Sequence, residues 1–387
     1  LEIEAPMKGI LLINLGSPKS LELKSVRTYL KEFLSDDLVI DLPKIAQQLL
    51  VNLIIVPFRS SKTLHAYSTV WTDQGSPLII ETQAMARAVT LVEVGPRDGI
   101  QAEPTILSTE DKIEFITRAI DAGTKRIEVT SFVNPKRVPQ MADAVEVLAG
   151  LPKDTGCSFI GLILNMKGYE RARDAGVDEV GYAVVATDTF ATKNQGMTSA
   201  ETVDAWNTVG RLAKSEGVRA GVTIGASFGC PFEGEVSPDH VADIAKRCAE
   251  SEPIEIALAD TIGCADPIRV TELIGKVKEA VPGMPIRVHL HNTRNTGLAN
   301  AYAAVEAGVD FMDASTGGIG GCPFAPRATG NIPLEDLIYM LNRMGVETGL
   351  DINKVIANAE WIADRLGGPV PAMLGKAGVF PDVANAA

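Results

Sequence analysis

The stretch DAGTKRIEV, residues 121–129, joins the end of a helical pattern to an apolar strand pattern, with Gly123 between them. The same arrangement recurs as DAGVDEVGY at residues 174–182 and as EAGVDFMDA at residues 306–314. Helices often end at a glycine in the left-handed conformation, which glycine adopts at low cost. The three copies therefore predict alternating helices and strands, with helix ends at Gly123, Gly176 and Gly308.

Strand-like runs continue this alternation along most of the chain. They are rich in β-branched residues and apolar on both faces, as buried parallel strands are. The eight runs are residues 89–94, 126–131, 158–164, 179–186, 220–227, 254–260, 286–292 and 309–315. Amphipathic stretches of helical length, such as 109–122 and 199–216, separate them. The pattern predicts an α/β fold, a (β/α)8 TIM barrel. The segment after Pro333 is predicted to form the last barrel helix and then a C-terminal helical extension. A doubly wound open sheet is the alternative, although no GxGxxG follows the first strand.

The first part of the chain has a different pattern, which divides the protein into residues 1–84 and a barrel domain of residues 85–387. KGILLINLGSP at residues 8–18 predicts one strand and a turn. LKSVRTYLKEFLSDD at residues 23–37 predicts an amphipathic helix. A single strand lacks the partners for a sheet of its own, so we expect a small N-terminal α/β fragment.

Composition narrows the class of protein. The formal net charge of −13 argues against a nucleic-acid or anionic-membrane surface. The longest apolar runs, such as residues 49–57, are too short to span a bilayer. The five cysteines include no CxxC pair, and no signal-peptide pattern is visible. We therefore expect free thiols in a reducing compartment and a cytoplasmic protein.

Polar residues near the predicted strand ends are candidates for an active site, because barrel enzymes place their chemistry at the C-terminal ends of the strands. His289 and His291 alternate along one strand, so their imidazoles face the same side. With the carboxylate of Asp98 and the amide oxygen of Asn331 they form a nitrogen and oxygen ligand set suited to Mg²⁺ or Mn²⁺. The alternative is a pair of satisfied polar residues inside the barrel.

Other candidates surround this ligand set. Arg97 follows the first strand, where a guanidinium can stabilise an oxyanion, although it can also be an ordinary salt-bridged arginine. Glu128 and Asp260 are acidic residues that can orient the histidines or Arg97. Cys322 follows the glycine-rich residues 317–321, which can close over a ligand. The alternative for Cys322 is a small buried residue in a tight turn.

Residues 89–380 resemble the hydroxymethylglutaryl-CoA lyase family of barrel metallolyases. The matching stretches, in order, are VEVGPRDGIQAE (92–103), IEVTSFVNPKRVPQM (127–141), GCPFEGEVSP (229–238), LADTIGCADP (258–267), HLHNTR (289–294) and GGIGGCPFAPRATGN (317–331). The resemblance implies a carbon–carbon lyase that cleaves a 3-hydroxyacyl-CoA by a retro-aldol step into acetyl-CoA and a 3-oxo acid. For hydroxymethylglutaryl-CoA, that acid is acetoacetate.

The resemblance also implies roles for individual residues. A divalent cation, Mg²⁺ or Mn²⁺, is expected to bind the carboxylate and hydroxyl oxygens of the acyl-CoA substrate. Its implied ligands are Asp98, His289, His291 and Asn331. The remaining implied roles are enolate stabilisation by Arg97, proton transfer by His289 and Cys322, support by Glu128 and Asp260, and a place beside the CoA for Asn194. We further expect a homo-oligomer, either a dimer or a tetramer.

Some positions depart from the family pattern and leave the acyl group open. Ala257 replaces a serine near the metal, and Asn292 replaces an aspartate after the second histidine. Pro326-Arg327 stands where typical lyases have Gln-Gly, and an inward-pointing Arg327 can contact an extra carboxylate. A malyl- or citramalyl-type thioester, or an aldol-condensing synthase, therefore remains as an alternative.

Residues 7–83 resemble the N-terminus of ferrochelatase. The matching stretches are MKGILLINLGSP (7–18), YLKEFLSDDLVIDLP (29–43) and PFRSSKTLHAYSTVWTDQGSPLI (57–79). The match ends before the histidine and glutamate that ferrochelatases use for metal insertion. We therefore expect a fused, non-catalytic fragment ending before Met85, with a porphyrin-binding module as the alternative.

Overall fold

The computed structural model describes residues 17–18, 20–35, 39, 42–69, 71–72, 76, 88–321 and 330–380. By its internal contacts the chain divides into two compact units, Leu1–Arg87 and Ala88–Ala387. Among the described residues, every helix is too short or too polar to cross a bilayer.

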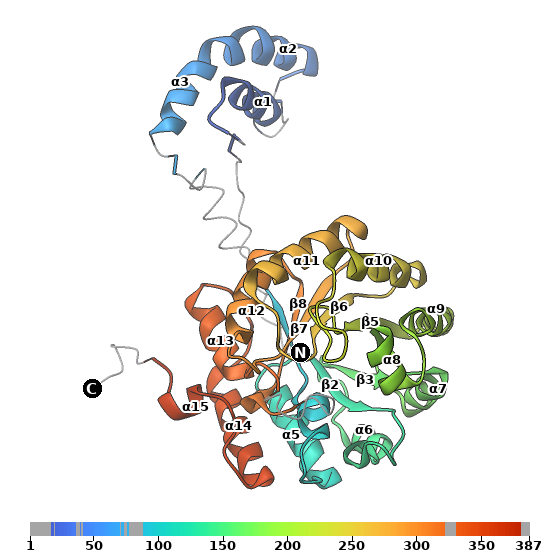
Figure 1. Ribbon diagram of the computed structural model, residues 1–387. Coiled ribbons are helices and arrows are strands. Elements are labelled where there is room, and N and C mark those ends of the chain that lie inside the picture. Colours follow the sequence, from blue (N-terminus) through green and yellow to red (C-terminus); the bar gives the residue numbers. More distant parts are fainter. Residues whose placement is uncertain are drawn as a thin grey trace, which may run out of the picture. The chain divides into compact units, whose positions relative to one another are not determined.

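The second unit is a closed barrel of eight parallel strands in sequential order, β1 to β8 (Figure 1). The strands are β1 (Thr90–Glu93), β2 (Arg126–Ser131), β3 (Ser158–Ile163), β4 (Glu179–Val185), β5 (Arg219–Gly225), β6 (Ile256–Asp260), β7 (Ile286–Leu290) and β8 (Phe311–Ala314). Pairing of β1 with β8, from Thr90 against Phe311 to Glu93 against Ala314, closes the barrel. Each strand lies within one of the eight predicted runs, apart from Arg219, and the TIM-barrel prediction is confirmed.

Helices surround the barrel and cover the outer face of the sheet (Figure 1). They are α5 (Thr109–Asp121), α6 (Ala144–Gly150), α7 (Met166–Ala175), α8 (Asp188–Gln195), α9 (Ser199–Glu216), α10 (Pro238–Cys248), α11 (Pro267–Ala280), α12 (Gly297–Glu306) and α13 (Leu334–Arg343). The predicted C-terminal extension consists of α14 (Ile352–Leu366) and α15 (Leu374–Ala377). The main apolar core fills the layer between the helices and the strands.

Local signals in the sequence explain where the helices begin and end. A capping box formed by Thr198 and Glu201 starts α9, because each side chain bonds the other residue's backbone N–H. The repeated glycines have positive φ as predicted, 101° at Gly123, 81° at Gly176 and 75° at Gly308. A Cβ at Gly123 would also lie 2.8 Å from the carbonyl oxygen of Gly349. That position therefore requires glycine for both its conformation and its packing.

The first unit is helical in its described residues. It contains α1 (Leu23–Leu34), α2 (Lys44–Leu49), the π-helical η1 (Leu50–Ile55) and α3 (Val56–Ser68). Val26 and Leu30 of α1 pack against Val51 and Val56 in a small core of their own. The amphipathic helix predicted at residues 23–37 corresponds to α1. Most of the predicted strand, residues 8–16, lies outside the described residues.

Candidate functional site

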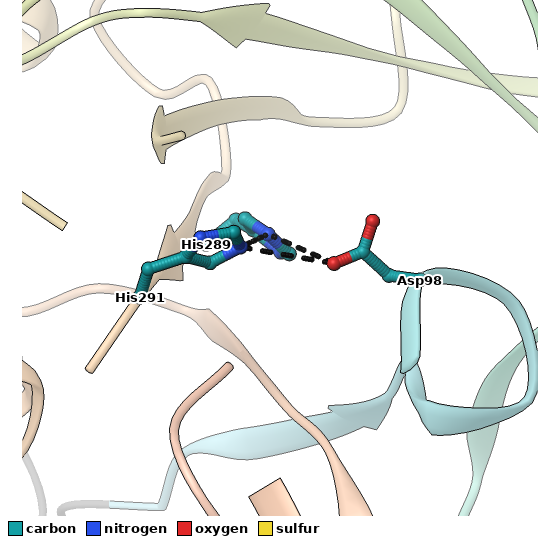
Figure 2. Close-up of side chains that lie close together, drawn as sticks. All are labelled: Asp98, His289 and His291. Carbon is teal, nitrogen blue, oxygen red and sulfur yellow. Dashed lines mark hydrogen bonds and ion pairs between the residues drawn. The ribbon is translucent and has the colours of Figure 1, made fainter. Parts of the chain in front are cut away.

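Three side chains converge at the C-terminal mouth of the barrel: Asp98, His289 and His291 (Figure 2). The Nε2 atoms of the two imidazoles are 3.0 Å apart, and each lies 3.7 Å from Asp98 Oδ2. All three residues are buried, with at most 8% of any residue exposed. Two imidazole nitrogens and a carboxylate oxygen therefore face one another in a space that one metal ion can occupy.

The backbone after β1 directs Asp98 into this site. Residues Gly95–Gly99 form a single π-helical turn, η2, in which Val94 O accepts hydrogen bonds from Asp98 N and Gly99 N. Such π-turns commonly occur at functional sites. A Cβ at Gly99 would lie 2.7 Å from Ile319 Cγ1, so glycine also permits the close approach of the segment after β8.

Arg97 lies beside the ligand set and is held by two carboxylates. Its Nε and Nη2 donate to Glu128 Oε2 at 2.8 and 2.6 Å, and its Nη1 donates to Asp98 Oδ1. Burial opposes ionisation of Asp98, but the Arg97 guanidinium and the two imidazoles outweigh it and hold the pKa of Asp98 below its usual range. Asp98 is therefore an anion at neutral pH, as a metal ligand must be.

Asn331 joins the cluster from the segment that follows the glycine-rich loop. Its Nδ2 donates to Asp98 Oδ2 at 3.0 Å and to the carbonyl oxygen of Ile319 at 3.1 Å. An isolated bridge pairs its backbone with that of His291. The four predicted metal ligands are thus brought together. Cys322 and Arg327 lie in residues 322–329, outside the described residues.

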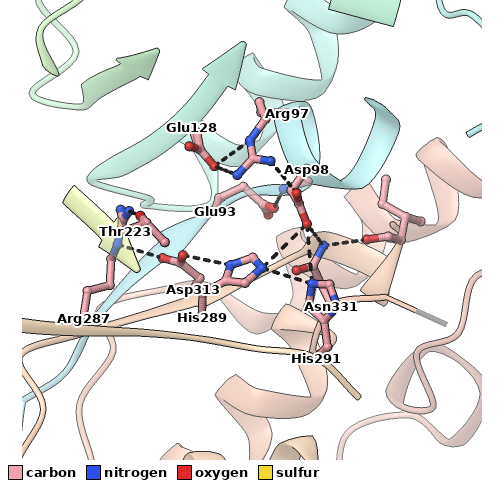
Figure 3. Close-up of polar contacts among 12 residues, drawn as sticks. Glu93, Arg97, Asp98, Glu128, Thr223, Arg287, His289, His291, Asp313 and Asn331 are labelled. Carbon is pink, nitrogen blue, oxygen red and sulfur yellow. Dashed lines mark hydrogen bonds and ion pairs between the residues drawn. The ribbon is translucent and has the colours of Figure 1, made fainter. Parts of the chain in front are cut away.

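Two charged residues that we did not select from the sequence lie directly behind His289. Asp313 Oδ2 is 3.0 Å from His289 Nδ1, and Arg287 Nε is 3.5 Å from Asp313 Oδ1 (Figure 3). Arg287 lies two residues before His289 on β7, and Asp313 lies on β8. A charged residue inside an otherwise apolar strand run is the sequence signal that marks both positions.

Asp260, which we expected to support Arg97 or the metal ligands, has other partners. Its Oδ1 accepts a hydrogen bond from Cys264 N at 2.8 Å, and its Oδ2 accepts one from Ala265 N at 3.0 Å. The carboxylate thereby shapes the turn that leads from β6 into α11. Glu128, by contrast, contacts Arg97 directly, as described above.

A cavity of about 570 Å³ opens over the cluster. This volume suits a small-molecule ligand. Arg97, Asp98, His289 and His291 line it, together with Asn194 of α8. Arg97, three of the predicted metal ligands and the residue predicted to lie beside the CoA therefore share one cavity.

The fold and this cluster define a class of protein: a TIM-barrel enzyme with a candidate divalent-metal site at its catalytic end. The family model described as HMGL-like matches residues 88–362, and the chain belongs to that family. Its curated relatives are CoA lyases, and lyases of this family depend on a divalent metal. A second family model, described as ferrochelatase, matches residues 7–94. Both resemblances expected from the sequence are confirmed.

Individual relatives agree with this assignment. A protein named (R)-citramalyl-CoA lyase from Chloroflexus aurantiacus is 44% identical over 311 residues, which is 78% of this chain and 98% of the relative. A hydroxymethylglutaryl-CoA lyase from Bacillus subtilis is 36% identical, over 74% of this chain and 95% of the relative. The human mitochondrial hydroxymethylglutaryl-CoA lyase is 39% identical, over 73% of this chain and 87% of the relative.

Solved structures show the same barrel. An HMG-CoA lyase from Acinetobacter baumannii, in complex with coenzyme A and 3-methylmalate, is 36% identical, with a TM-score of 0.74 over 76% of this chain and 97% of that one. The HMG-CoA lyase of Bacillus subtilis is 35% identical, with a TM-score of 0.73 over 76% of this chain and 98% of that one.

Proposed function

We propose that the protein cleaves the mono-CoA thioester of a 3-hydroxy-3-methyl dicarboxylic acid and releases acetyl-CoA. The observation that carries this proposal is the convergence of Asp98, His289 and His291 beside Arg97 in one cavity of a lyase-family barrel. Those groups offer a cation site for substrate oxygens and a fixed guanidinium for a developing negative charge.

Two thioesters fit this description and differ by one methylene group. Hydroxymethylglutaryl-CoA, our first expectation from the sequence, would give acetoacetate, and citramalyl-CoA would give a 2-oxo acid. Both carry a methyl group and a hydroxyl group on the carbon that is cleaved, and both end in a carboxylate. The higher identity to the relative named citramalyl-CoA lyase, 44% against 36% and 39%, favours the shorter acyl chain.

The reaction needs no oxidant and no water. The substrate hydroxyl loses its proton, the bond between carbons 2 and 3 breaks, and its electron pair moves toward the thioester oxygen as an enolate. A proton then returns to carbon 2 to give acetyl-CoA. When bound by Asp98, His289, His291 and Asn331, a Mg²⁺ or Mn²⁺ ion supplies a Lewis acid for the hydroxyl and carboxylate oxygens.

Individual residues of the chain are proposed to carry out separate steps of this reaction. Arg97, fixed by Glu128, is proposed to stabilise the enolate oxygen. Both ring nitrogens of His289 have neighbours, Asp313 at Nδ1 and the ligand set at Nε2, which favours a ligand role over a freely exchanging base. Proton return is therefore proposed for Cys322. Asn194 and the exposed Arg137, which both line the cavity, are proposed to contact the CoA portion.

The experiment is a panel of thioesters incubated with the purified full chain. We expect release of acetyl-CoA from citramalyl-CoA, hydroxymethylglutaryl-CoA or both with Mg²⁺ or Mn²⁺, loss of activity with EDTA, and recovery when metal is restored. The ratio of kcat/KM between the two thioesters assigns the substrate. Absence of cleavage across the panel with either metal would refute the proposal.

A further inference from the structure

We propose that Asp313 and Arg287 are positioning residues that fix the orientation and tautomer of His289, so that its Nε2 lone pair faces Asp98 and His291. The inference rests on the proposed metal site and deepens it. It assigns to two residues inside the barrel a role in metal affinity, although neither is a ligand.

The first step is the pairing of β7 with β8. His289 and Asp313 are direct partners in the register of these strands, and Nδ1 lies 3.0 Å from Asp313 Oδ2. A carboxylate only accepts hydrogen bonds, so the bonded Nδ1 carries the hydrogen. In a neutral imidazole the other nitrogen then has the free lone pair. Nε2, which faces His291, is therefore the nitrogen available for a metal.

The second step is the support of Asp313 itself. Arg287 Nε lies 3.5 Å from Asp313 Oδ1, and Arg287 Nη1 lies 3.2 Å from Glu255 Oε1. Arg287 Nη2 donates to Thr223 Oγ1 at 3.4 Å (Figure 3). Contacts in three directions hold the guanidinium under the carboxylate of Asp313.

The small side chain of Ala257 fits this arrangement. In the strand register Ala257 pairs with Thr223 on one side and with Arg287 on the other. A methyl group at this position leaves room for Arg287 to extend over β6 to Thr223. The alanine that departs from the family pattern thus lies directly beside the arginine that supports Asp313.

The network continues toward the opposite end of the barrel. Arg126 pairs with Glu255 at 2.7 Å and with Glu179 at 2.6 Å, and Glu179 lies 3.2 Å from Arg219. Barrel interiors are usually packed with branched apolar side chains. Buried ion pairs are weak evidence for stability, because desolvation offsets their attraction. The part of the series that reaches the candidate metal ligand, Arg287 and Asp313, is better explained by control of that ligand.

The test compares Mn²⁺ affinity among full-length variants, measured from the electron paramagnetic resonance signal of free Mn²⁺. Asp313→Asn keeps the shape but lets an amide N–H face Nδ1, which favours the wrong tautomer. We expect its Mn²⁺ dissociation constant to rise about 10- to 100-fold, the usual effect of losing such a partner. Arg287→Met should raise it by a smaller factor.

The matched control is Glu179→Gln, which breaks the same network far from His289. It should lower the melting temperature as the Asp313 variant does, yet leave Mn²⁺ affinity unchanged. Unchanged Mn²⁺ affinity in Asp313→Asn, or an equal loss of Mn²⁺ affinity in Glu179→Gln, overturns the inference. The charged residues would then only pack the interior of the barrel. If the wild-type protein binds no Mn²⁺, the metal site fails and this inference fails with it.

A measurement on the wild-type protein covers the case in which the Asp313 variant does not fold. The chain has four histidines, so ¹⁵N-histidine NMR of the Mg²⁺-loaded protein can resolve each ring. We expect the hydrogen of His289 on Nδ1, and a hydrogen on Nε2 overturns the inference. Intact Mg²⁺ binding combined with that result would leave the proposed function standing.

Discussion

Arg97 donates two hydrogen bonds to a single oxygen of Glu128, from Nε at 2.8 Å and from Nη2 at 2.6 Å. The guanidinium is therefore fixed from β2 while it lines the cavity. We predict that Arg97→Gln lowers kcat by about 10²- to 10³-fold, the usual loss on removing an oxyanion partner. The measurement is acetyl-CoA release at saturating metal, with Mn²⁺ affinity followed in parallel because Arg97 also contacts Asp98.

The control for this variant is Arg118→Gln on α5. Arg118 pairs with Glu114 on the helix surface, and 37% of its side chain is exposed. Its replacement should therefore leave kcat unchanged. Glu128→Gln should give an intermediate loss, because it loosens Arg97 without removing it. Full activity in Arg97→Gln would show that another group stabilises the enolate.

Removal of one imidazole should strongly weaken metal binding. His291→Ala takes away one of the three groups that converge in Figure 2 and leaves His289 and Asp98 as an incomplete set. We expect Mn²⁺ affinity to fall by at least about 100-fold and activity to fall with it. Calorimetric titration with Mn²⁺ measures this, and His65→Ala on the exposed surface of α3 is the histidine control. Equal Mn²⁺ affinity in His291→Ala and His65→Ala would show that the metal binds elsewhere.

The sequence predicts the strands and the candidate metal ligands, but not the residues that support those ligands. Runs such as 179–186 are apolar on both faces, as the buried strands of a parallel sheet are, and their regular alternation with helical stretches allowed the barrel to be derived. Asp98, His289 and His291 follow from their places at strand ends. Asp313 and Arg287 could not be assigned, because their roles depend on which strands pair across the closed barrel.

Asp260 illustrates the remaining difficulty. A carboxylate at a strand end can face the barrel mouth or accept hydrogen bonds from the next turn, and both choices give the same local sequence. The side chain bonds the backbone N–H groups of Cys264 and Ala265. Its role is set by the conformation of the loop after β6, which strand periodicity does not encode.

The two compact units lead to a prediction about truncation. All described residues of the proposed site, from Arg97 to Asn331, belong to Ala88–Ala387. We therefore expect a chain that starts at Met85 to retain kcat/KM within about twofold, because a separately folded domain carries its own core. Steady-state assays on both chains measure this. A loss of tenfold or more, with a native circular dichroism spectrum, would give the first 84 residues a part in the activity.

Gly320 offers a steric test of Asn331. Its φ is 124°, and a Cβ there would lie 2.7 Å from Asn331 Nδ2. Gly320→Ala should therefore displace Asn331 from Asp98 and weaken Mn²⁺ binding by about tenfold, in line with the loss of a supporting contact. Gly345→Ala is the matched control, because Gly345 also has a positive φ, 74°, but has no atom within 4 Å of the added Cβ. Both variants should lose stability, and only the first should lose metal affinity. Equal metal affinity would argue against a ligand role for Asn331.

Glu93 leads to a prediction about stability and pH. Burial raises the pKa of Glu93 to about 7, and hydrogen bonds from Thr316 and Gly95 offset this only in part. In the unfolded chain the carboxyl titrates near its ordinary value of about 4.3. Between these values the unfolded state releases the proton first, so the free energy of unfolding falls as pH rises. Above pH 7 the Glu93 carboxyl is ionised in both the folded and the unfolded state. The free energy of unfolding then stays lower by a constant amount, on the order of 3 kcal/mol.

Glu93→Gln should remove this slope, because its amide does not titrate. Urea unfolding of both proteins between pH 5 and pH 8, with EDTA present so that metal binding adds nothing, measures the difference. Burial also raises the pKa of Glu335, to about 8, but that slope is common to both proteins and largely cancels. We expect the wild-type free energy of unfolding to fall about 3 kcal/mol further than that of the variant over this range. Parallel curves would mean that Glu93 is already ionised in the folded protein at pH 5, with the hydrogen bonds from Thr316 and Gly95 outweighing its burial.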